Sequence, residues 1–567
     1  MSARKKRWIA KPAAPPEFLA SMPDLSPVVA TLLHQRGIQN RQQVDAFLST
    51  DYRSGMYDPM LLKGMPLAAE RVVAAIANSE PMVVYGDFDA DGVTAVTLLI
   101  QAIRAMGGDI QPYIPHRTRE GYGLNNVAAE KLAETGVKLL ITVDCGISNV
   151  AEVAHAQSLG LDVIITDHHT PPDVLPAAYA IINPKQAGEA YPFAQLTGVG
   201  LAYKLVQALV RLGMKMALRG RDLLDVVALG TVADLGPLQG ENRVLVKAGL
   251  ESLNSTQRPG LRALIEAAGL VQGRVTATDI SFMLGPRLNA AGRLDDAVLA
   301  YKLLLADDIG EARTLAAELN AANRRRQELT KEIHATASAS IREQGTHARI
   351  IVHDGDYAAG LVGLVAARLV EEFARPVLLI ERGDEHSRGS ARSLPGFSII
   401  DALRTCDDLF ERYGGHSAAA GFTIATERLP ALEQRLNEYA AAQLPDELLQ
   451  SALEIDASLP LDALSWELLG QLGSLEPFGQ SNPQPVLMSS RVRAVGWARG
   501  AENAHLKLRL DDGNGGPSFD AIAFRLGSLA SFFSTPRWID VAYTFEANEW
   551  QGQRSLQLNV KDFRSVK

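Results

Sequence analysis

The fold is constrained most by an alternation of apolar runs and helical stretches between Met82 and about Val210. Four apolar runs, VVYGD, IQPYIP, KLLITVDCG and DVIITDHH, are separated by stretches with helical periodicity, such as 125–135 and 149–159. Strands that alternate with helices at this spacing form a parallel sheet with helices on both faces. The sequence therefore predicts an α/β multidomain protein that contains a doubly wound parallel-sheet domain.

Acidic and histidine side chains follow three of these runs at the point where each strand ends. In open parallel sheets, ligands bind at the carboxyl ends of the strands, so we expect these side chains to converge in one crevice. In chain order they are Asp87, Asp89, Asp91, Asp144, Asp167, His168 and His169.

The stretch GDFDADG, residues 86–92, begins like an EF-hand calcium loop. Such a loop, counted from Asp87, needs a bidentate glutamate at its twelfth position, which is Leu98 here. The flanking patterns favour a strand, an acidic loop and a helix instead. Taken alone, the acids could simply cap that helix near the positive end of its dipole. Together with the acids and imidazoles of neighbouring strand ends, they favour a site for divalent ions.

The residue types in this cluster indicate a metal-assisted phosphate chemistry. All-oxygen sites suit Mg²⁺ or Ca²⁺, whereas an added imidazole shifts the preference toward Mn²⁺, Zn²⁺ or Fe²⁺. Two such ions about 3.5–4 Å apart activate a water and neutralise phosphate oxygens in an in-line displacement. Asp234, within the apolar sequence VVALGTVADLGPL, is a further candidate ligand, with a helix cap or an ion pair as the alternative. Cys145 has no CxxC partner, and a small residue before a turn explains it better than a thiol nucleophile does.

The composition is that of a folded cytoplasmic protein. Hydrophobic residues make up 47% of the chain and charged residues 21%, and two cysteines provide no disulfide framework. The net charge is −9, but residues 485–567 carry 11 Lys+Arg against 8 Asp+Glu. The C-terminal part is therefore the basic part of the chain, which is where contact with a polyanion is easiest to expect.

Periodicity and turn signals divide the chain into five segments. We expect an N-terminal extension at 1–60, which includes a short helical pattern around 26–48. The parallel-sheet domain and a helical extension occupy 61–309, followed by one long connecting helix at 310–344. A second α/β domain occupies 345–447, and a small antiparallel β barrel or sandwich occupies 448–567.

Two motifs of the second α/β domain suit an anion. GSARS offers the hydroxyl of Ser390 and the fork of Arg392, although the same residues are common in exposed strands. GGHSAAAG, residues 414–421, lets the backbone approach a ligand closely and adds His416 as a donor, although a plain glycine turn explains it equally well.

The ordered motifs resemble a known superfamily. DFDADG, PHRTREGYG, VDCG, TDHH and ALGTVADLGPL look like the DHH phosphoesterases, and GSARS with GGHSAAAG looks like their companion DHHA1 domain. GPRLNAAGRLDD, LEPFGQSNPQPV and the β-rich tail resemble specifically the bacterial single-strand-specific 5′-to-3′ DNA exonucleases of that superfamily. The resemblance extends from about Leu61 to Phe563.

This resemblance implies roles for individual residues. The expected metal ligands are Asp89, Asp91, Asp144, His168 and Asp234. Asp87 and Asp167 correspond to acids in or next to the ligand set, and His169 to the histidine that faces the scissile phosphate. The expected substrate contacts are Arg117, Ser390 and Arg392 for the 5′-terminal phosphate, and Arg287, Gly415 and His416 for the nucleic-acid backbone.

The resemblance also implies an activity and partners. We expect a two-metal exonuclease, using Mn²⁺ or Mg²⁺, that releases 5′-mononucleotides in DNA recombination and repair, with an OB-fold tail that grips single-stranded DNA. The implied state is a monomer, and the implied partners are a single-strand-binding protein and a RecQ-type helicase. One departure is Tyr357-Ala358, where many members have Trp-His.

Two other functions remain as alternatives. A DHH phosphodiesterase of short oligonucleotides, cyclic dinucleotides or polyphosphate usually ends after the DHHA1 domain. A non-catalytic DHH replication scaffold loses metal ligands, whereas this chain keeps them.

Overall fold

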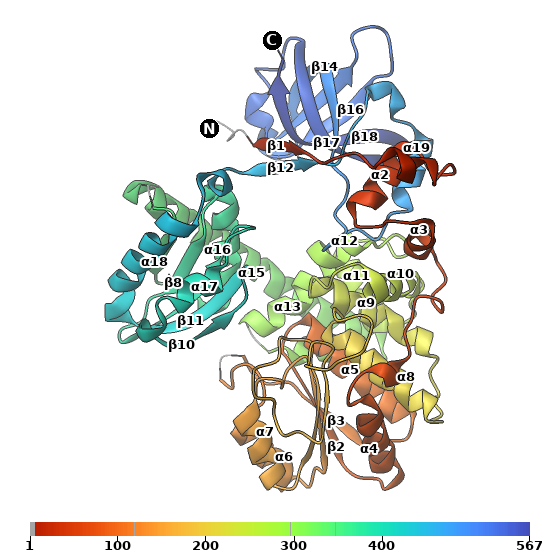
Figure 1. Cartoon of the computed structure of the whole chain (residues 1–567), viewed down its shortest axis with the longest axis vertical. Coiled ribbons are helices and arrows are strands. Elements are labelled where there is room, and N and C mark those ends of the chain that lie inside the picture. Colours follow the sequence, from red (N-terminus) through yellow and green to blue (C-terminus); the bar gives the residue numbers. More distant parts are fainter. Residues whose placement is uncertain (1–5, 118, 295, 346–347, 567) are drawn as a thin grey trace. The chain divides into compact units, whose positions relative to one another are not determined.

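The computed structural model describes residues 6–117, 119–294, 296–345 and 348–566 (Figure 1). The chain forms two compact units. One, the parallel-sheet unit, comprises residues 36–323 and 471–484. The other, the barrel-containing unit, comprises the chain up to residue 35 together with 324–470 and 485–567.

The parallel-sheet unit is built on five parallel strands in the order β3-β2-β4-β5-β6. Strands β2 and β4 are buried along their whole length, as expected for near-continuous apolar runs covered on both faces. The first strand of the sheet, β2, lies between β3 and β4, so the direction of winding reverses beside β2. Their bounds are β2 Met82–Gly86, β3 Ile110–Tyr113, β4 Leu139–Val143, β5 Asp162–Thr166 and β6 Ala180–Ile182.

Helices cover both faces of this sheet, which confirms the doubly wound fold. Val84 and Ile141 face one core, formed with α4 (Met65–Ala77), α5 (Ala90–Ala105) and α8 (Gly198–Arg211). The alternate side chains Val83 and Leu140 face the other core, formed with α6 (Asn126–Glu134) and α7 (Val150–Ser158).

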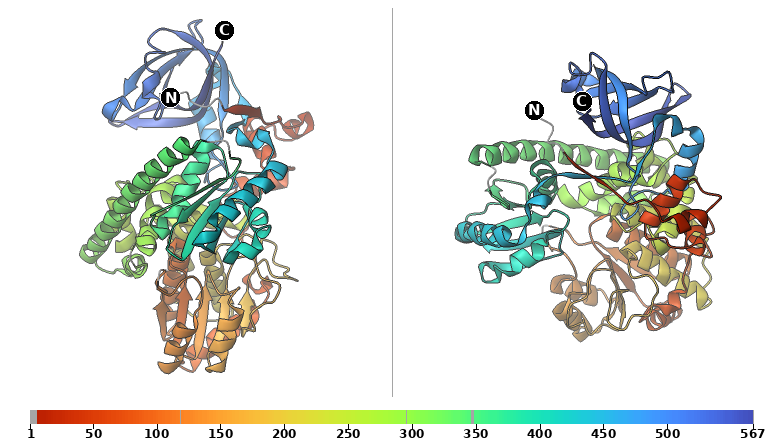
Figure 2. Two further views of the ribbon diagram at one scale, coloured as in Figure 1. Left: turned by 90° about the vertical axis from the view of Figure 1, so that its left-hand side faces the viewer. Right: turned by 45° about the horizontal axis from the view of Figure 1, so that its top comes forward.

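A helical extension follows the sheet, and then one long helix. The extension comprises α9 (Leu224–Ala233), α10 (Gly240–Asn254), α11 (Pro259–Ala267), α12 (Ala277–Asp279), the π-helix η3 (Ile280–Leu284), α13 (Gly285–Leu294) and α14 (Val298–Leu305). The expected long connecting helix is α15 (Ile309–Gln344), visible along its length in Figure 2.

The barrel-containing unit has a second α/β core. Its sheet has the order β10-β11-β9-β8-β7, with α16 (Ala359–Phe373), α17 (Ile399–Arg404) and α18 (Leu429–Gln443) packed against it. The strands are β7 Ile351–Gly355, β8 Val377–Glu381, β9 His386–Arg392, β10 Phe410–Gly415 and β11 Ala419–Ala425.

The C-terminal strands form the expected small β barrel. The order is β13-β14-β15-β16-β18-β17, and pairing of β14 with β17 closes it. Most ladders are antiparallel, but β13–β14 and β16–β18 are parallel. Helix α19 (Trp466–Gly473) lies between the first two strands in the chain. The strands are β13 Ala457–Ser458, β14 Leu487–Arg499, β15 His505–Asp511, β16 Phe519–Ala523, β17 Arg537–Trp550 and β18 Gln553–Ser565.

The N-terminal segment contains a strand that the sequence patterns do not reveal. β1 (Arg7–Ala10) pairs in parallel with β12 (Ala452–Ile455), and the indole of Trp8 donates to Asp562 at 2.7 Å. The expected helical pattern at 26–48 is two helices, α2 (Pro27–Gln35) and α3 (Arg41–Leu48), separated at Gly37 with φ +81°. A short helix, α1 (Pro16–Ala20), precedes them.

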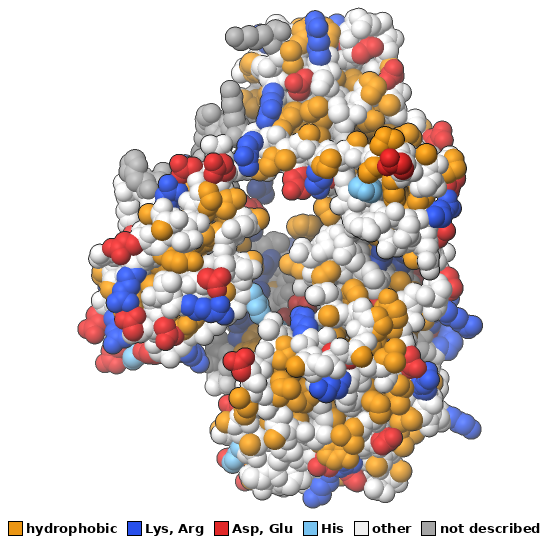
Figure 3. Space-filling view, in the orientation of Figure 1, with side chains coloured by type: hydrophobic (Ala, Val, Ile, Leu, Met, Phe, Trp, Pro, Cys, Tyr) orange, Lys and Arg blue, Asp and Glu red, His pale blue; other side chains and the backbone are white. Residues whose placement is uncertain are grey.

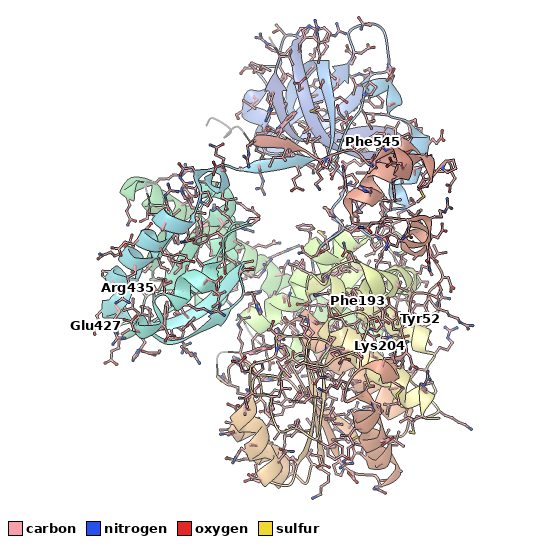
Figure 4. The ribbon with its side chains drawn as sticks, viewed as in Figure 1. Tyr52, Phe193, Lys204, Glu427, Arg435 and Phe545 are labelled. Atoms are coloured by element: carbon pink, nitrogen blue, oxygen red, sulfur yellow. The ribbon has the colours of Figure 1, made fainter. Side chains whose placement is uncertain are left out.

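A buried ion pair anchors residues 52–58 within the parallel-sheet unit. Lys204 of α8 pairs with Glu241 of α10, and both side chains are completely buried. Lys204 also donates to the backbone oxygen of Tyr57, and the hydroxyl of Tyr52 lies 2.8 Å from that of Tyr203. Figure 4 shows Tyr52 and Lys204 close together in this unit.

Charged and apolar side chains are interspersed over the face of the molecule shown in Figure 3. Among the described residues, no helix combines the length and the apolar character needed to span a membrane.

Candidate metal centre

The acidic loop connects β2 directly to α5. Asp89 is the N-cap of α5, and its Oδ1 accepts from the backbone N–H groups of Asp91 and Gly92 at 2.9 and 3.1 Å. A Cβ on Gly92 would lie 2.5 Å from the backbone oxygen of Asp87, so only glycine permits this tight fold. Leu98 is fully buried within α5. The loop is therefore a helix start that gathers carboxylates, and it does not close around calcium.

Asp91 is held by the N-terminus of a second helix. Its carboxylate accepts from the backbone N–H groups of Gly198 and Val199, at 2.6 and 2.9 Å, in the first turn of α8. A Cβ on Gly198 would lie 2.6 Å from Cβ of Asp144. A Cβ on Gly230 of α9 would overlap Thr94 of α5. These two glycines let α8 and α9 approach the acidic loop closely.

The remaining residues of the cluster come from three other elements. Asp144 follows β4 in a left-handed conformation, with φ +60°. His168 follows β5, and its Nε2 lies 3.0 Å from Asp144 Oδ1, 3.7 Å from Asp234 Oδ2 and 3.9 Å from Asp91 Oδ2. Asp234 is the C-cap of α9. The structure thus brings the residues expected as metal ligands to the point beside β2 where the winding reverses, which is where such sheets bind ligands.

The side chains fall into overlapping sets that suit more than one ion. Within each set, one ligand atom per residue lies within 4.8 Å of the others. One set shares Asp144 with a second set and His168 with the remaining set, so ions bound in overlapping sets would be neighbours. They are Asp91, His168 and Asp234; Asp87, Asp89 and Asp144; and Asp144, His168 and His169.

The electrostatics of the cluster favour a cation. Burial and the charge of Asp89 raise the pKa of Asp91 to about 7. Burial and neighbouring carboxylates also raise the pKa values of Asp87, Asp144 and Asp234 well above the usual range. Burial lowers the pKa of His168 to about 3, which keeps its imidazole neutral and able to bind a metal. Crowded buried carboxylates of this kind are stabilised when divalent cations replace their protons.

Two buried atoms provide an independent test of the fit. Asp144 Oδ1 and His168 Nε2 face each other, and neither makes a hydrogen bond within the part of the chain that the structure describes. A buried acceptor without a hydrogen bond is costly unless something else neutralises it. Carboxylates with one neutral imidazole form a donor set that accepts Mn²⁺ and Mg²⁺. The residues present therefore fit such ions.

Asp167 and His169 form a separate pair beside the cluster. Asp167 accepts from the backbone N–H groups of Ile147 and His169, at 2.9 and 3.0 Å, and lies 2.8 Å from His169 Nδ1. Burial acts to lower the pKa of His169, but the hydrogen bond and charge of Asp167 outweigh it and raise the pKa. Asp167 therefore orients this imidazole and favours its protonated form.

Arg117 and Arg287 also belong to the parallel-sheet unit. The guanidinium of Arg117 lies 4.8 Å from the centre of the Phe88 ring, next to the acidic loop. Arg287 of α13 donates to the backbone oxygen of Met283 at 2.6 Å and to Asn320 at 3.1 Å. The same helix reaches the loop through Asn289, which accepts from the N–H of Ala90 at 2.7 Å.

The other expected substrate contacts lie in the barrel-containing unit. Arg392 donates to the hydroxyl of Ser390 at 2.8 Å, and burial lowers the pKa of Arg392. Gly415 is opposite Ala420, which is itself opposite Ala391. His416 begins the turn that follows. The GSARS and GGHSAAAG motifs are therefore on neighbouring strands of one sheet.

Three domain families match the sequence in the order expected. The DHH family, N-terminal domain, matches residues 81–231, the DHHA1 domain matches 342–442, and the RecJ OB domain matches 455–562. The single-stranded-DNA-specific exonuclease RecJ of Bacillus subtilis is 38% identical over 99% of this chain and 71% of its own length. That of Escherichia coli is 36% identical over 95% of this chain and 96% of its own length. The chain belongs to the RecJ family.

Solved RecJ structures agree with this assignment. RecJ from Thermus thermophilus in complex with Mn²⁺ superposes with a TM-score of 0.83, at 32% identity, covering 100% of this chain and 80% of that one. The same protein in complex with Mg²⁺ gives a TM-score of 0.77, at 30% identity, covering 99% and 79%. The expected choice of Mn²⁺ or Mg²⁺ as cofactor is thereby supported.

Some residues around this RecJ-family site were not found from the sequence. The hydroxyl of Tyr122 lies 3.3 Å from both the backbone oxygen of Asp144 and Nδ1 of His169. Tyr122 and Asn289 lie within quoted motifs and Gly198 lies outside them, and the roles of all three depend on contacts between distant segments. Cys145 is fully buried and burial raises its pKa, which agrees with a structural thiol.

Proposed function

We propose that this chain is a metal-dependent, single-strand-specific DNA exonuclease that begins at the 5′ end and releases 5′-mononucleotides. The observation that carries the proposal is the cluster of five carboxylates and His168, which come from the carboxyl ends of β2, β4 and β5 and from the end of α9, in a chain of the RecJ family. The five acids are Asp87, Asp89, Asp91, Asp144 and Asp234.

The cluster would hold two Mn²⁺ or Mg²⁺ ions. When bound, such ions neutralise phosphate oxygens and lower the pKa of a water that attacks the phosphorus in line. Asp89, Asp91, Asp144, His168 and Asp234 are the proposed ligands, with Asp87 in or next to the set. The backbone N–H groups of α8 fix Asp91, and those at the start of α5 fix Asp89. The ligands therefore need little rearrangement to bind.

His169 is the proposed contact of the scissile phosphate. Its Nδ1 is directed at Asp167, so Nε2 remains to donate a hydrogen bond to a phosphate oxygen. The raised pKa of His169 favours the protonated, donating form at neutral pH. Such a donor stabilises the charge that develops as the bond to the 3′ oxygen breaks.

Polarity would follow from recognition of a terminal phosphate. Arg392 with Ser390, together with Arg117, would bind the 5′-phosphate, while Arg287, Gly415 and His416 would contact the backbone. Breaking the bond between phosphorus and the 3′ oxygen releases one 5′-mononucleotide and leaves a new 5′-phosphate on the strand. Each product is therefore the next substrate for the same phosphate contacts. The barrel would grip the single-stranded DNA.

Digestion of end-labelled DNA tests this function. We expect Mn²⁺ or Mg²⁺ to support release of labelled mononucleotide from 5′-labelled single strands, with EDTA and duplex DNA giving none. Release of the 3′ label before the 5′ label would contradict the polarity. Activity on short oligonucleotides or cyclic dinucleotides with none on long strands would favour the other DHH phosphodiesterases.

A substitution tests the metal assignment. Asp91→Ala removes a carboxylate of the ligand set, so we expect nucleotide release to stop while single-stranded DNA binding persists. Asp91→Asn retains an acceptor for the helix N–H groups and separates loss of a ligand from loss of folding. Asp173→Asn, at an exposed acid, is the matched control. Undiminished turnover in both Asp91 variants would refute the assignment.

We also propose the cellular setting that the family resemblance implies. The enzyme would act as a monomer in the cytoplasm in recombination and repair, with a single-strand-binding protein and a RecQ-type helicase as partners. Light scattering after size exclusion tests the monomer. Digestion rates with each partner added to coated or duplex DNA test the partnerships.

A further inference from the structure

The residue after Asp234 has an unusual backbone conformation. Helix α9 ends in a Schellman motif, in which the N–H of Gly236 donates to Thr231 at 2.9 Å and the N–H of Leu235 donates to Val232 at 3.2 Å. Leu235 occupies the left-handed position of this motif, with φ +59°. Glycine is the usual residue there, because a side chain with a Cβ is strained in this conformation.

The packing of the protein does not account for a leucine at this position. Leu235 is 62% exposed. It therefore gains little from burial, while its backbone carries the strain of the left-handed conformation. Asp144 is also left-handed, but a short polar side chain tolerates that conformation better than a branched apolar one. At functional sites, strain of this kind usually persists because the side chain has a task.

The residue that follows Leu235, Gly236, must be glycine because there is no space for a side chain. A Cβ on Gly236 would lie 2.6 Å from Thr197 and 2.9 Å from the backbone oxygen of Thr231. The close approach of α8 and α9 thus requires glycine at 236, but nothing comparable requires leucine at 235.

The position of Leu235 relates it to the metal centre. It directly follows Asp234, whose Oδ2 lies 3.7 Å from Nε2 of His168. On the Asp144 side, the centre is bordered by the exposed ring of Tyr122, whose hydroxyl contacts the backbone of Asp144. An exposed leucine therefore directly follows one acid of the centre in the chain, and an exposed aromatic residue contacts the backbone of another. A nucleotide presents its phosphate beside an apolar base, so a phosphate at the carboxylates brings a base to their border.

We propose that Leu235 is a substrate contact, which packs against the base of a nucleotide adjoining the scissile phosphate. The inference rests on the proposed exonuclease function and deepens it. An aliphatic side chain contacts any base without reading its identity, as an enzyme that degrades strands of every sequence requires. The left-handed backbone fixes where this side chain projects, so little ordering is needed when the strand binds.

Two substitutions separate the strain from the contact. Leu235→Gly removes both, and Leu235→Ala removes the contact but keeps the strain. With 5′-phosphorylated single strands and saturating Mn²⁺, we expect both variants to raise KM about tenfold, since the apolar burial of one leucine is lost. Only Leu235→Gly should raise Tm, by about 2 °C, as relief of strain in a unit of this size predicts. The control is Leu159→Ala, at an exposed leucine that precedes the amino end of β5, whereas the metal centre lies at the carboxyl ends of the strands.

A substrate change identifies the base as the partner. When the first two nucleotides carry abasic sites, the KM of the wild-type enzyme should rise and the penalty of both variants should fall below twofold. The inference is overturned if both variants keep the wild-type KM, if the penalty persists on abasic strands, or if Leu235→Gly lowers Tm. Failure of the proposed function itself would be seen separately, as absence of hydrolysis by the wild-type enzyme.

Discussion

At the scale of single residues, the pairing of Asp167 with His169 makes a sharp prediction. Asp167 is almost fully buried and accepts three hydrogen bonds, one of them from the imidazole. Asp167→Asn removes the charge that favours the protonated ring, so we expect kcat to fall about 10- to 100-fold, as for other residues that orient a catalytic side chain. Steady-state kinetics and Mn²⁺ titration calorimetry measure this, and metal affinity should change little.

The two residues should act as one unit. We expect His169→Ala to lower kcat, and the double variant to be no slower than His169→Ala alone, because Asp167 acts through the imidazole. If the two losses multiply instead, Asp167 has a task of its own in the metal centre.

Individual residues of the metal centre and its border show how much of a site can be predicted from the sequence. Asp144 and His168 could be placed together because each follows a strand, and the ends of parallel strands share one edge. Tyr122 and Leu235 could not, since one acts through contacts with separate segments and the other through a backbone angle. Periodicity and residue type carry neither kind of information.

At the scale of elements, the approach of α8 to the acidic loop controls the metal centre. Gly198→Ala would place a Cβ 2.6 Å from that of Asp144, in the helix turn whose N–H groups hold Asp91. We expect Mn²⁺ affinity to fall at least tenfold, which is the scale of effects from residues that orient ligands. Titration calorimetry with Mn²⁺ is the measurement.

A glycine in the same helix gives a matched control. A Cβ on Gly200 would make only ordinary contacts, the nearest at 3.4 Å to Leu196. Gly200→Ala should therefore keep the metal affinity and stabilise α8 by up to about 1 kcal/mol through helix propensity. Equal losses of affinity in the two variants would show that the spacing at Asp144 is not what matters.

Elements with strong internal patterns were predicted well, and those that depend on distant partners were not. The long helix α15 follows from 36 residues of uninterrupted helical composition. Strand β1 is only four residues long and mostly exposed, and its partner β12 is more than 400 residues away in the chain. The three-residue strand β6 also escaped detection, because it is too short to show a period.

At the scale of the whole molecule, residues 471–484 connect the two units through the path of the chain. This segment begins within the last turn of α19 and ends before β14, and it belongs to the parallel-sheet unit although the chain on both sides of it belongs to the other unit. It folds around Arg243, which is only 3% exposed and donates to the backbone oxygens of Leu475 and Glu476 at 3.1 and 2.7 Å. The same guanidinium lies 3.8 Å from the ring centre of Phe47. The motif LEPFGQSNPQPV is thus an anchor for the chain that enters the barrel.

The anchor gives a prediction for Arg243→Ala. The substitution leaves several buried carbonyl groups without donors, so we expect it to destabilise the parallel-sheet unit by about 3 kcal/mol. Amide exchange should accelerate within 471–484, while Mn²⁺ affinity at the carboxylate cluster is retained. Arg221→Ala, at an exposed arginine paired with Glu251, should change stability by less than about 0.5 kcal/mol. Unchanged exchange in 471–484 would show that Arg243 does not hold the segment. If Arg243 does hold the segment, a truncation that removes residues before 484 also disturbs the unit that carries the metal centre. If it does not, removal of the β-rich tail should weaken DNA binding without affecting hydrolysis at the metal centre.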